Sequence, residues 1–239
     1  MVFLSAVSDK RLTKYAWRVL FGTFIAPFVL GVLFFGFAGE WTIFRGWLFV
    51  AVMLIGMFGG TVVVAVLSPE LMNQRGKWKK AEGTKWWDKI IIQVFGILGY
   101  YGVAAVAGFD FANGWSYLGI LWCITGVALY LAGSAFFTWA MAVNRHFEVT
   151  VRIQTDRAHQ VVTTGPYRLV RHPGYAGAIL WIISSPLILG SAYALIPAGI
   201  AIATLILRIV LEECALKNEL PGYSEYTRET RYRLLPGFW

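Results

Sequence analysis

Six long apolar stretches constrain the fold of this 239-residue chain more than any other feature. A helix needs about 20 consecutive apolar residues to cross the hydrocarbon core of a bilayer. Only 14% of the residues are charged, against about 25% in a typical soluble domain. We therefore predict an all-α integral membrane protein with about six transmembrane helices, over residues 16–38, 44–67, 90–109, 117–142, 174–189 and 193–211.

The positions of lysine and arginine predict the orientation of these spans. Of the 21 basic residues, 20 lie up to Arg18, from Arg208 onward, or in the segments 68–89 and 143–172, and only Arg45 lies elsewhere. These groups occupy alternate gaps between spans, so all 20 fall on one side of the membrane. Because basic loops stay in the cytoplasm, both termini are expected there. The net charge of +8 then indicates attraction to membrane lipid headgroups, and nucleic acid is not an expected partner.

The last two spans differ from the first four. The stretch 174–189 would be roughly 24 Å long as a helix, shorter than the hydrocarbon core of about 30 Å. It contains Pro186, the next span contains Pro197, and only a short Gly-Ser-Ala turn separates them. We expect a tight helical hairpin that need not cross the bilayer fully. Residues 1–142 would then be a four-helix transmembrane scaffold, and residues 143–239 the functional region, with the hairpin and an interfacial tail.

Polar residues gather near the cytoplasmic ends of these last two spans. Pro173 suits the first turn of a helix, so His172 is expected at the N-terminus of the fifth span. Free backbone N–H groups at that point favour an anion such as a ligand carboxylate. In the sixth span, Arg208 and Glu212 are four residues apart and share one helix face. They either contact a ligand or pair with each other to end the helix.

Several short strings in the second half carry a resemblance to a known family. They are Gly165-Pro166-Tyr167, Arg171-His172-Pro173-Gly174-Tyr175-Ala176-Gly177, and Glu212-Glu213 followed by Leu216, Tyr223, Tyr226, Arg233, Pro236 and Trp239. In this order and spacing they resemble the isoprenylcysteine carboxyl methyltransferase family over roughly residues 144–239. The phosphatidylethanolamine methyltransferases are similar in this half. Pro69-Glu70-Leu71 and Trp87-Asp88 also look like loops in bacterial members.

The resemblance implies a site for S-adenosylmethionine. The cofactor-binding positions it implies are His159, Gln160, Val161, Val162, Tyr167, His172, Pro173, Gly174, Tyr175 and Glu212. Arg208 matches an arginine that contacts the methyl acceptor. The expected function is a membrane-embedded, S-adenosylmethionine-dependent methyltransferase acting on a lipophilic acceptor, with the carboxylate of a prenylated cysteine as the first choice.

The nature of the acceptor decides which catalytic groups are needed. A carboxylate is already ionised at pH 7, so alignment by Arg208 together with desolvation would carry the catalysis. A phospholipid amine or a small thiol would need a base, for which Glu213 is the nearest candidate. Two other classes stay open at this point: an NADPH-dependent reductase of the sterol type, and a non-catalytic membrane scaffold or transporter.

No metal site is expected. The two cysteines, Cys123 and Cys214, lie in apolar surroundings and cannot complete a four-ligand zinc site. His146 follows Arg145 in a basic loop, which favours a place at the membrane interface over a catalytic one.

Overall fold

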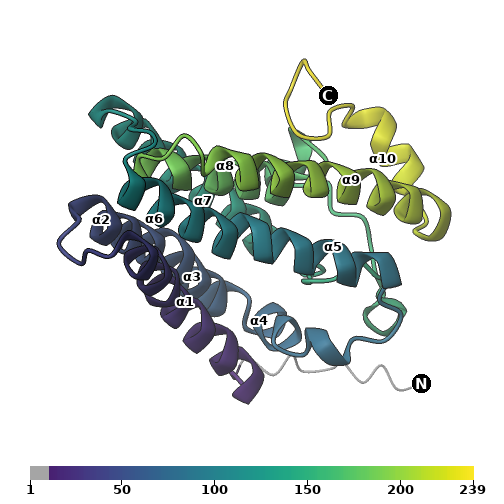
Figure 1. Ribbon diagram of the computed structural model, residues 1–239. Coiled ribbons are helices and arrows are strands. Elements are labelled where there is room, and N and C mark those ends of the chain that lie inside the picture. The colour runs from purple at the N-terminus through teal and green to yellow at the C-terminus, as the bar shows by residue number, and fades with distance from the viewer. Residues whose placement is uncertain (1–10) are drawn as a thin grey trace, which may run out of the picture.

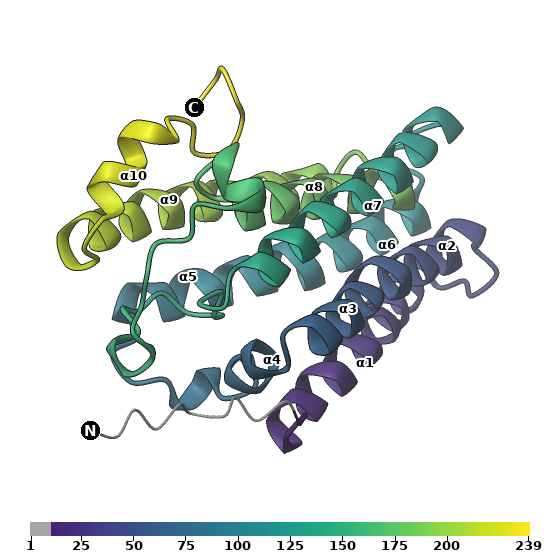
Figure 2. The ribbon, with the colours of Figure 1, turned by 180° about the vertical axis from the view of Figure 1, so that it is seen from behind.

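The computed structural model describes residues 11–239, and in that part of the chain it is a bundle of helices without strands (Figures 1 and 2). The first half contains α1 (Lys14–Ala38), α2 (Phe44–Met53), α3 (Gly59–Leu67), the short α4 (Pro69–Arg75), α5 (Trp86–Gly96), α6 (Val103–Asn113) and α7 (Ile120–Val143). A π-helical stretch joins α2 to α3, and another joins α5 to α6. The second half contains α8 (Pro173–Leu189), α9 (Leu195–Glu219) and α10 (Tyr223–Glu229).

Each of the six predicted stretches forms a helix over most of its length, although the helices of the fourth and sixth begin at Ile120 and Leu195, two or three residues later than predicted. Among the described residues, five helical runs are long and apolar enough to cross a membrane: Lys14–Ala38, Phe44–Leu67, Trp86–Asn113, Ile120–Val143 and Leu195–Glu219. The sixth, α8, is also apolar but has only 17 residues. Large apolar side chains such as Phe21, Val66 and Leu121 are 67%, 73% and 75% exposed. Apolar surface on this scale suits contact with lipid rather than water, which agrees with an all-α integral membrane protein.

The predicted hairpin of the last two helices is present. Gly190 ends α8 with φ 86°, a left-handed conformation that costs a glycine little. Its N–H and that of Ser191 donate to the Pro186 carbonyl at 2.8 and 3.0 Å. On its other side α8 packs closely on α7, where a Cβ on Gly133 would lie 2.8 Å from the Gly177 carbonyl oxygen. The hairpin is thereby fixed against the first half of the chain.

Two π-helical stretches interrupt the long helices at Leu54–Phe58 and Ile97–Gly102. Such stretches hold one residue more per turn than an α-helix and often occur near functional sites. The second one lies against α8 and α9, since a Cβ on Gly99 would lie 2.8 Å from Ile182 and 3.2 Å from Ala201. Helix α5 packs on α9, whereas α6 packs mainly on α1.

One end of the bundle gathers the segments rich in basic residues. The start of α1, helix α4, the start of α5, the segment 144–172 and the C-terminal tail all lie there (Figures 1 and 2). The turns around residues 39–43, 114–119 and 190–194 lie at the opposite end. The two ends therefore differ in charge as the sequence predicts, and the cytoplasmic location of the basic end stays a prediction.

Candidate functional site

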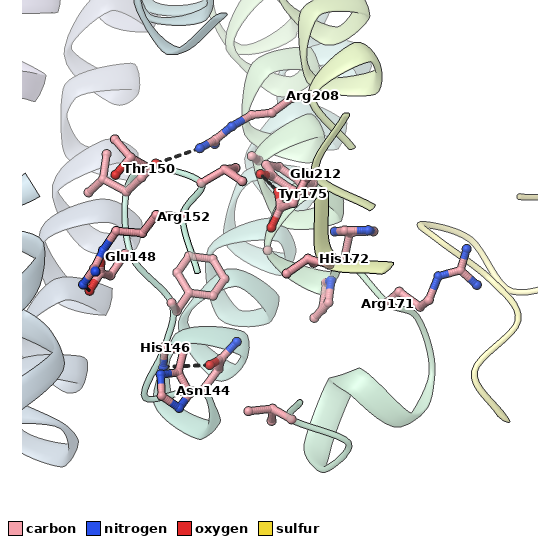
Figure 3. A pocket seen from close by; sticks show the side chains of 18 of the residues that line it. Asn144, His146, Glu148, Thr150, Arg152, Arg171, His172, Tyr175, Arg208 and Glu212 are labelled. Atoms are coloured by element: carbon pink, nitrogen blue, oxygen red, sulfur yellow. Dashed lines mark hydrogen bonds and ion pairs between the residues drawn. The ribbon is translucent and has the colours of Figure 1, made fainter. Parts of the chain in front are cut away.

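A cavity of about 370 Å³ opens at the basic end of the bundle, between α5, α8, α9 and the segment that follows α7 (Figure 3). Its walls come from both halves of the chain. The first half contributes Arg75, Ile91, Ile92, Phe95, Gly96, Tyr100 and Phe137, and the rest come from residues 144–226. The predicted boundary at residue 142 between scaffold and functional region therefore runs through the lining of the cavity, which has residues from both sides.

The start of α8 forms one wall, as predicted. The helix begins at Pro173, with His172 at its N-cap. Phe147 packs directly against Gly174, so closely that a Cβ at this position would overlap the ring. The first backbone N–H groups of a helix have no intrahelical acceptor. Gly174 and Tyr175, in the first turn of α8, line the cavity, so this helix start is a place that favours an anion.

Arg208 and Glu212 both line the cavity from α9, but each has its own partner. The Tyr175 hydroxyl donates a short hydrogen bond to Glu212. Arg208 donates from Nε and Nη2 to the Asp88 carboxylate at 2.6 and 3.2 Å, and from Nη2 to the Val149 carbonyl at 2.8 Å. Figure 3 shows Arg208 reaching from α9 toward the loop that carries Thr150, with Tyr175 and Glu212 beside each other. A simple Arg208–Glu212 ion pair is therefore not what ends this helix.

Glu213 is held away from the cavity. Its carboxylate accepts hydrogen bonds from Arg171 and from Arg233 Nε, the latter at 2.7 Å, and it lies 3.3 Å from His172 Nε2. Arg171 also donates to the carbonyls of Thr230 and Arg231. This cluster ties the start of α8 to the C-terminal tail. Glu213 is absent from the cavity-lining residues, so its position suits a structural ion pair better than proton transfer.

The segment after α7 supplies a second polar wall. His146 and His159 lie with their rings 4.6 Å apart, and both line the cavity. Burial and the neighbouring cations lower the pKa of His159 to about 4, and burial also lowers that of His146. Both rings are therefore neutral at pH 7. His146 is buried, and its Nδ1 lies 3.2 Å from Gln154 Oε1, which holds the ring inside the loop.

An aromatic and aliphatic cluster closes the cavity toward the tail. Tyr167, Leu220, Tyr223 and Tyr226 are buried together. The Tyr226 hydroxyl donates to the Tyr167 carbonyl at 2.7 Å, and Tyr167 accepts from Asn144 at 2.9 Å. Tyr223 Oη is the one buried side-chain polar atom without a hydrogen-bond partner in the described part of the chain. Burial raises the pKa of Tyr223, so its hydroxyl remains a free donor beside the cavity.

Part of the cavity wall is apolar. Ile91, Ile92 and Phe95 come from α5, and Leu205 comes from α9. Leu205 and Arg208 are one helical turn apart, so Arg208 marks the boundary between the apolar and polar parts. Burial and the nearby Arg208 lower the pKa of Arg75, which also lines the cavity, to about 10. Two guanidinium groups that are charged at pH 7 thus face the same space.

Comparison with known proteins identifies the region that contains these walls. Residues 109–218 match the sequence model of the isoprenylcysteine carboxyl methyltransferase family. This region is similar to that family. The match starts in α6 and ends at the last turn of α9, so it includes all the predicted cofactor positions together with Arg208 and Glu213. It excludes Arg75, Asp88 and Tyr223, although these residues line the cavity or contact its walls.

Named relatives agree with this family. A protein of Oryza sativa subsp. indica named as a probable protein-S-isoprenylcysteine O-methyltransferase is 29% identical over 121 residues, which cover 48% of this chain and 58% of the relative. Protein-S-isoprenylcysteine O-methyltransferase B of Arabidopsis thaliana is 28% identical over 82 residues, which cover 34% of this chain and 42% of the relative. The chain therefore matches little more than half the length of the first of these methyltransferases.

The structure brings most of the predicted residues together. The positions that line the cavity as expected are Arg208, His159, Gln160, Val161, Val162, Tyr167, His172, Pro173, Gly174, Tyr175 and Glu212. Sequence reasoning left out Arg75, Asn144, Arg152, Gln154 and Tyr223, which also line it. Tyr223 belongs to the family-like string and its aromatic character was a usable signal, whereas nothing in the sequence places Arg75 near α9.

Proposed function

We propose that the protein is a membrane methyltransferase that transfers a methyl group from S-adenosylmethionine to the carboxylate of a prenylated cysteine or a similar lipophilic acceptor. The observation that carries this proposal is the mixed lining of the cavity, in which Arg208 and other polar groups lie together with apolar side chains from α5 and α9. The match to the family model and the names of the rice and Arabidopsis relatives support the same chemistry. An acceptor with a long apolar chain and an anionic head would fit both kinds of lining.

The polar part of the cavity has the groups that S-adenosylmethionine requires. The N-terminus of α8 beside His172 suits the methionyl carboxylate, and Glu212 suits the amine or the ribose hydroxyls. The unpartnered Tyr223 hydroxyl offers a donor to an adenine nitrogen or a ribose oxygen, because buried polar groups are nearly always hydrogen-bonded. The cavity of about 370 Å³ is within the usual range for small-molecule sites. When bound, this cofactor supplies an electrophilic methyl group on a sulfonium.

The charges in the cavity favour an acceptor that is already anionic. Arg75 and Arg208 face it, while the Glu148 carboxylate is bound by Arg152 at 2.7 Å. Glu212 already accepts from Tyr175. A phospholipid amine would arrive protonated at pH 7 and would meet Arg75 and Arg208, while Glu212 is the carboxylate that we assign to the cofactor. A carboxylate needs only to be oriented and desolvated, which the chain can do with Arg208 and the apolar wall.

The test uses full-length protein in detergent micelles or lipid nanodiscs. The protein is incubated with methyl-tritiated S-adenosylmethionine and N-acetyl-S-farnesylcysteine, and base-labile methyl esters are counted. Transfer to this acceptor, and none to N-acetylcysteine without the prenyl chain, is the expected result. Transfer to phosphatidylethanolamine instead would overturn the carboxylate assignment. Binding of NADPH without binding of S-adenosylhomocysteine would overturn the whole proposal.

A further inference from the structure

Asp88 is a fully buried carboxylate beside the cavity. It lies in the first turn of α5 and is 0% exposed. Its Oδ1 accepts from Arg208 Nε at 2.6 Å, and its Oδ2 accepts from Arg208 Nη2 at 3.2 Å and from the Val151 N–H at 2.8 Å. A buried charge is costly unless it is paired and hydrogen-bonded, and Asp88 meets both conditions. Its bonds join α5, α9 and the loop after α7 at one point.

These bonds fix the direction of the Arg208 guanidinium. Its Nε and Nη2 both donate hydrogen bonds to Asp88, and Nη2 also donates to the Val149 carbonyl. The ring of Tyr175 lies 5.3 Å from its Cζ. Nη1 is the only guanidinium nitrogen of Arg208 for which the described residues provide no hydrogen-bond partner. A planar guanidinium held on one edge presents its remaining donor in a set direction.

The ion pair with Asp88 also changes how strongly Arg208 stabilises a bound acceptor carboxylate. A carboxylate loses its negative charge when it is methylated. A full, unshared arginine charge would therefore stabilise the acceptor before reaction more than in the transition state, which slows the reaction. Because Asp88 shares the charge of Arg208, the acceptor is oriented by one hydrogen bond rather than bound as a tight ion pair.

We propose that Asp88 is the positioning residue that aims Arg208 Nη1 at the acceptor carboxylate and moderates its charge. This inference rests on the proposed function, because it concerns the acceptor side of the same site. It adds a residue from the first half of the chain, outside the region that matches the family. It also explains why Arg208 does not pair with Glu212, its neighbour one turn along α9.

The decisive experiment is a double-mutant cycle with Asp88→Asn and Arg208→Ala. The Asn side chain keeps an oxygen for the Val151 N–H but places an amide group against the Arg208 donors. We expect Asp88→Asn to lower kcat/KM for N-acetyl-S-farnesylcysteine by about tenfold or more, and the double variant to be no worse than Arg208→Ala alone. Additive losses would overturn the proposal, because they would mean that Asp88 acts independently of Arg208.

Matched measurements separate positioning from general damage. The affinity for S-adenosylhomocysteine should stay within about twofold in Asp88→Asn, since the donor side is untouched. Thr84→Val is the control, because Thr84 holds the same loop through Thr150 at 3.2 Å without touching Arg208. Its kcat/KM should match the unaltered protein. If Thr84→Val reproduces the loss, or if donor affinity falls together with acceptor turnover, Asp88 is merely structural.

Two further readouts keep the inference testable. Asp88→Glu retains a carboxylate and should recover part of the turnover that Asp88→Asn loses, whereas turnover no better than that of Asp88→Asn would overturn the proposal. The dissociation constant of N-acetyl-S-farnesylcysteine, measured by calorimetry without any methyl donor, should change in Asp88→Asn and stay unchanged in Thr84→Val. Absence of methyl transfer in the unaltered protein rejects the proposed function, while an unchanged acceptor affinity in Asp88→Asn rejects the role of Asp88.

Discussion

The Tyr175 hydroxyl donates a hydrogen bond to the Glu212 carboxylate and so joins the first turn of α8 to α9 at the cavity wall. This contact leaves Arg208 free of Glu212 and paired with Asp88 instead. Two residues that are neighbours on one helix face therefore belong to different parts of the site. Glu212 lies with the start of α8, and Arg208 lies with α5 at the boundary of the apolar part.

Substitutions of these two residues should fail in different ways. Arg208→Ala should leave S-adenosylhomocysteine affinity nearly intact while methyl transfer falls by about 100-fold, because acceptor alignment is lost. Glu212→Ala should weaken S-adenosylhomocysteine binding by about 1.5–3 kcal/mol, the range for a hydrogen bond to a charged group. Calorimetry and turnover on each variant test this. Glu219→Gln on the same helix breaks only the exposed pair with Lys85, and normal binding and turnover are expected for it.

Removing the Tyr223 hydroxyl should affect the ligand and not the fold. Its oxygen has no partner among the described residues, so Tyr223→Phe should keep the melting temperature or raise it. Affinity for S-adenosylhomocysteine should fall by about 0.5–1.5 kcal/mol if the hydroxyl bonds to it. Tyr226→Phe is the matched comparison, because it removes a bond of 2.7 Å to the Tyr167 carbonyl and should lower the melting temperature. Unchanged affinity in Tyr223→Phe would remove this residue from the donor site.

Acidification should weaken the loop that holds the two histidines. His159 titrates near 6.5 in an unfolded chain but has a pKa of about 4 in the fold. Its neutral form therefore stabilises the fold fully above pH about 6.5, and that contribution is lost as the pH falls toward 4. The melting temperature of the unaltered protein should drop over this window more than that of His159→Asn. Parallel curves for the two proteins would contradict the expectation.

Cysteine labelling tests the orientation in the membrane. In a Cys123→Ala/Cys214→Ser background, Asn113→Cys and Lys79→Cys place single thiols at opposite ends of the bundle. A membrane-impermeant reagent applied to intact cells should label position 113 only, because basic loops remain in the cytoplasm. Labelling at position 79 alone would reverse the predicted orientation. Labelling at both positions would contradict the six-helix arrangement.

Much of the fold follows from the sequence because membrane-spanning helices depend on local apolar length. The stretch 44–67 was bounded correctly, and the predicted end of α8 at Leu189 is confirmed. The predicted start of the third span at residue 90 is late, since α5 begins at Trp86. Its first turn contains Lys89 and Asp88, and hydropathy alone excludes such charges although Asp88 is buried by its ion pair.

The site was predicted where it depends on short strings and missed where it depends on long-range pairing. His172 at the start of α8 follows from the His-Pro pair, so its place was predictable. The partner of Arg208 lies 120 residues away, and no periodicity links the two. The sequence makes Glu213 the nearest candidate base for an amine or thiol acceptor. On a helix, adjacent residues point about 100° apart, and Glu213 accordingly contacts the tail.

The π-helical stretch Ile97–Gly102 lies between two helical segments, α5 and α6, that pack on different neighbours. It lets one continuous helix turn its α5 face toward the cavity and its α6 face toward α1. If this stretch became regular α-helix with no change in length, one half would rotate against the other by about 100°. Ile91 and Phe95 would then swing away from the cavity, and Asp88 would swing with them. The extra residue that this π-helical turn absorbs is therefore as much a part of the site as any side chain in it.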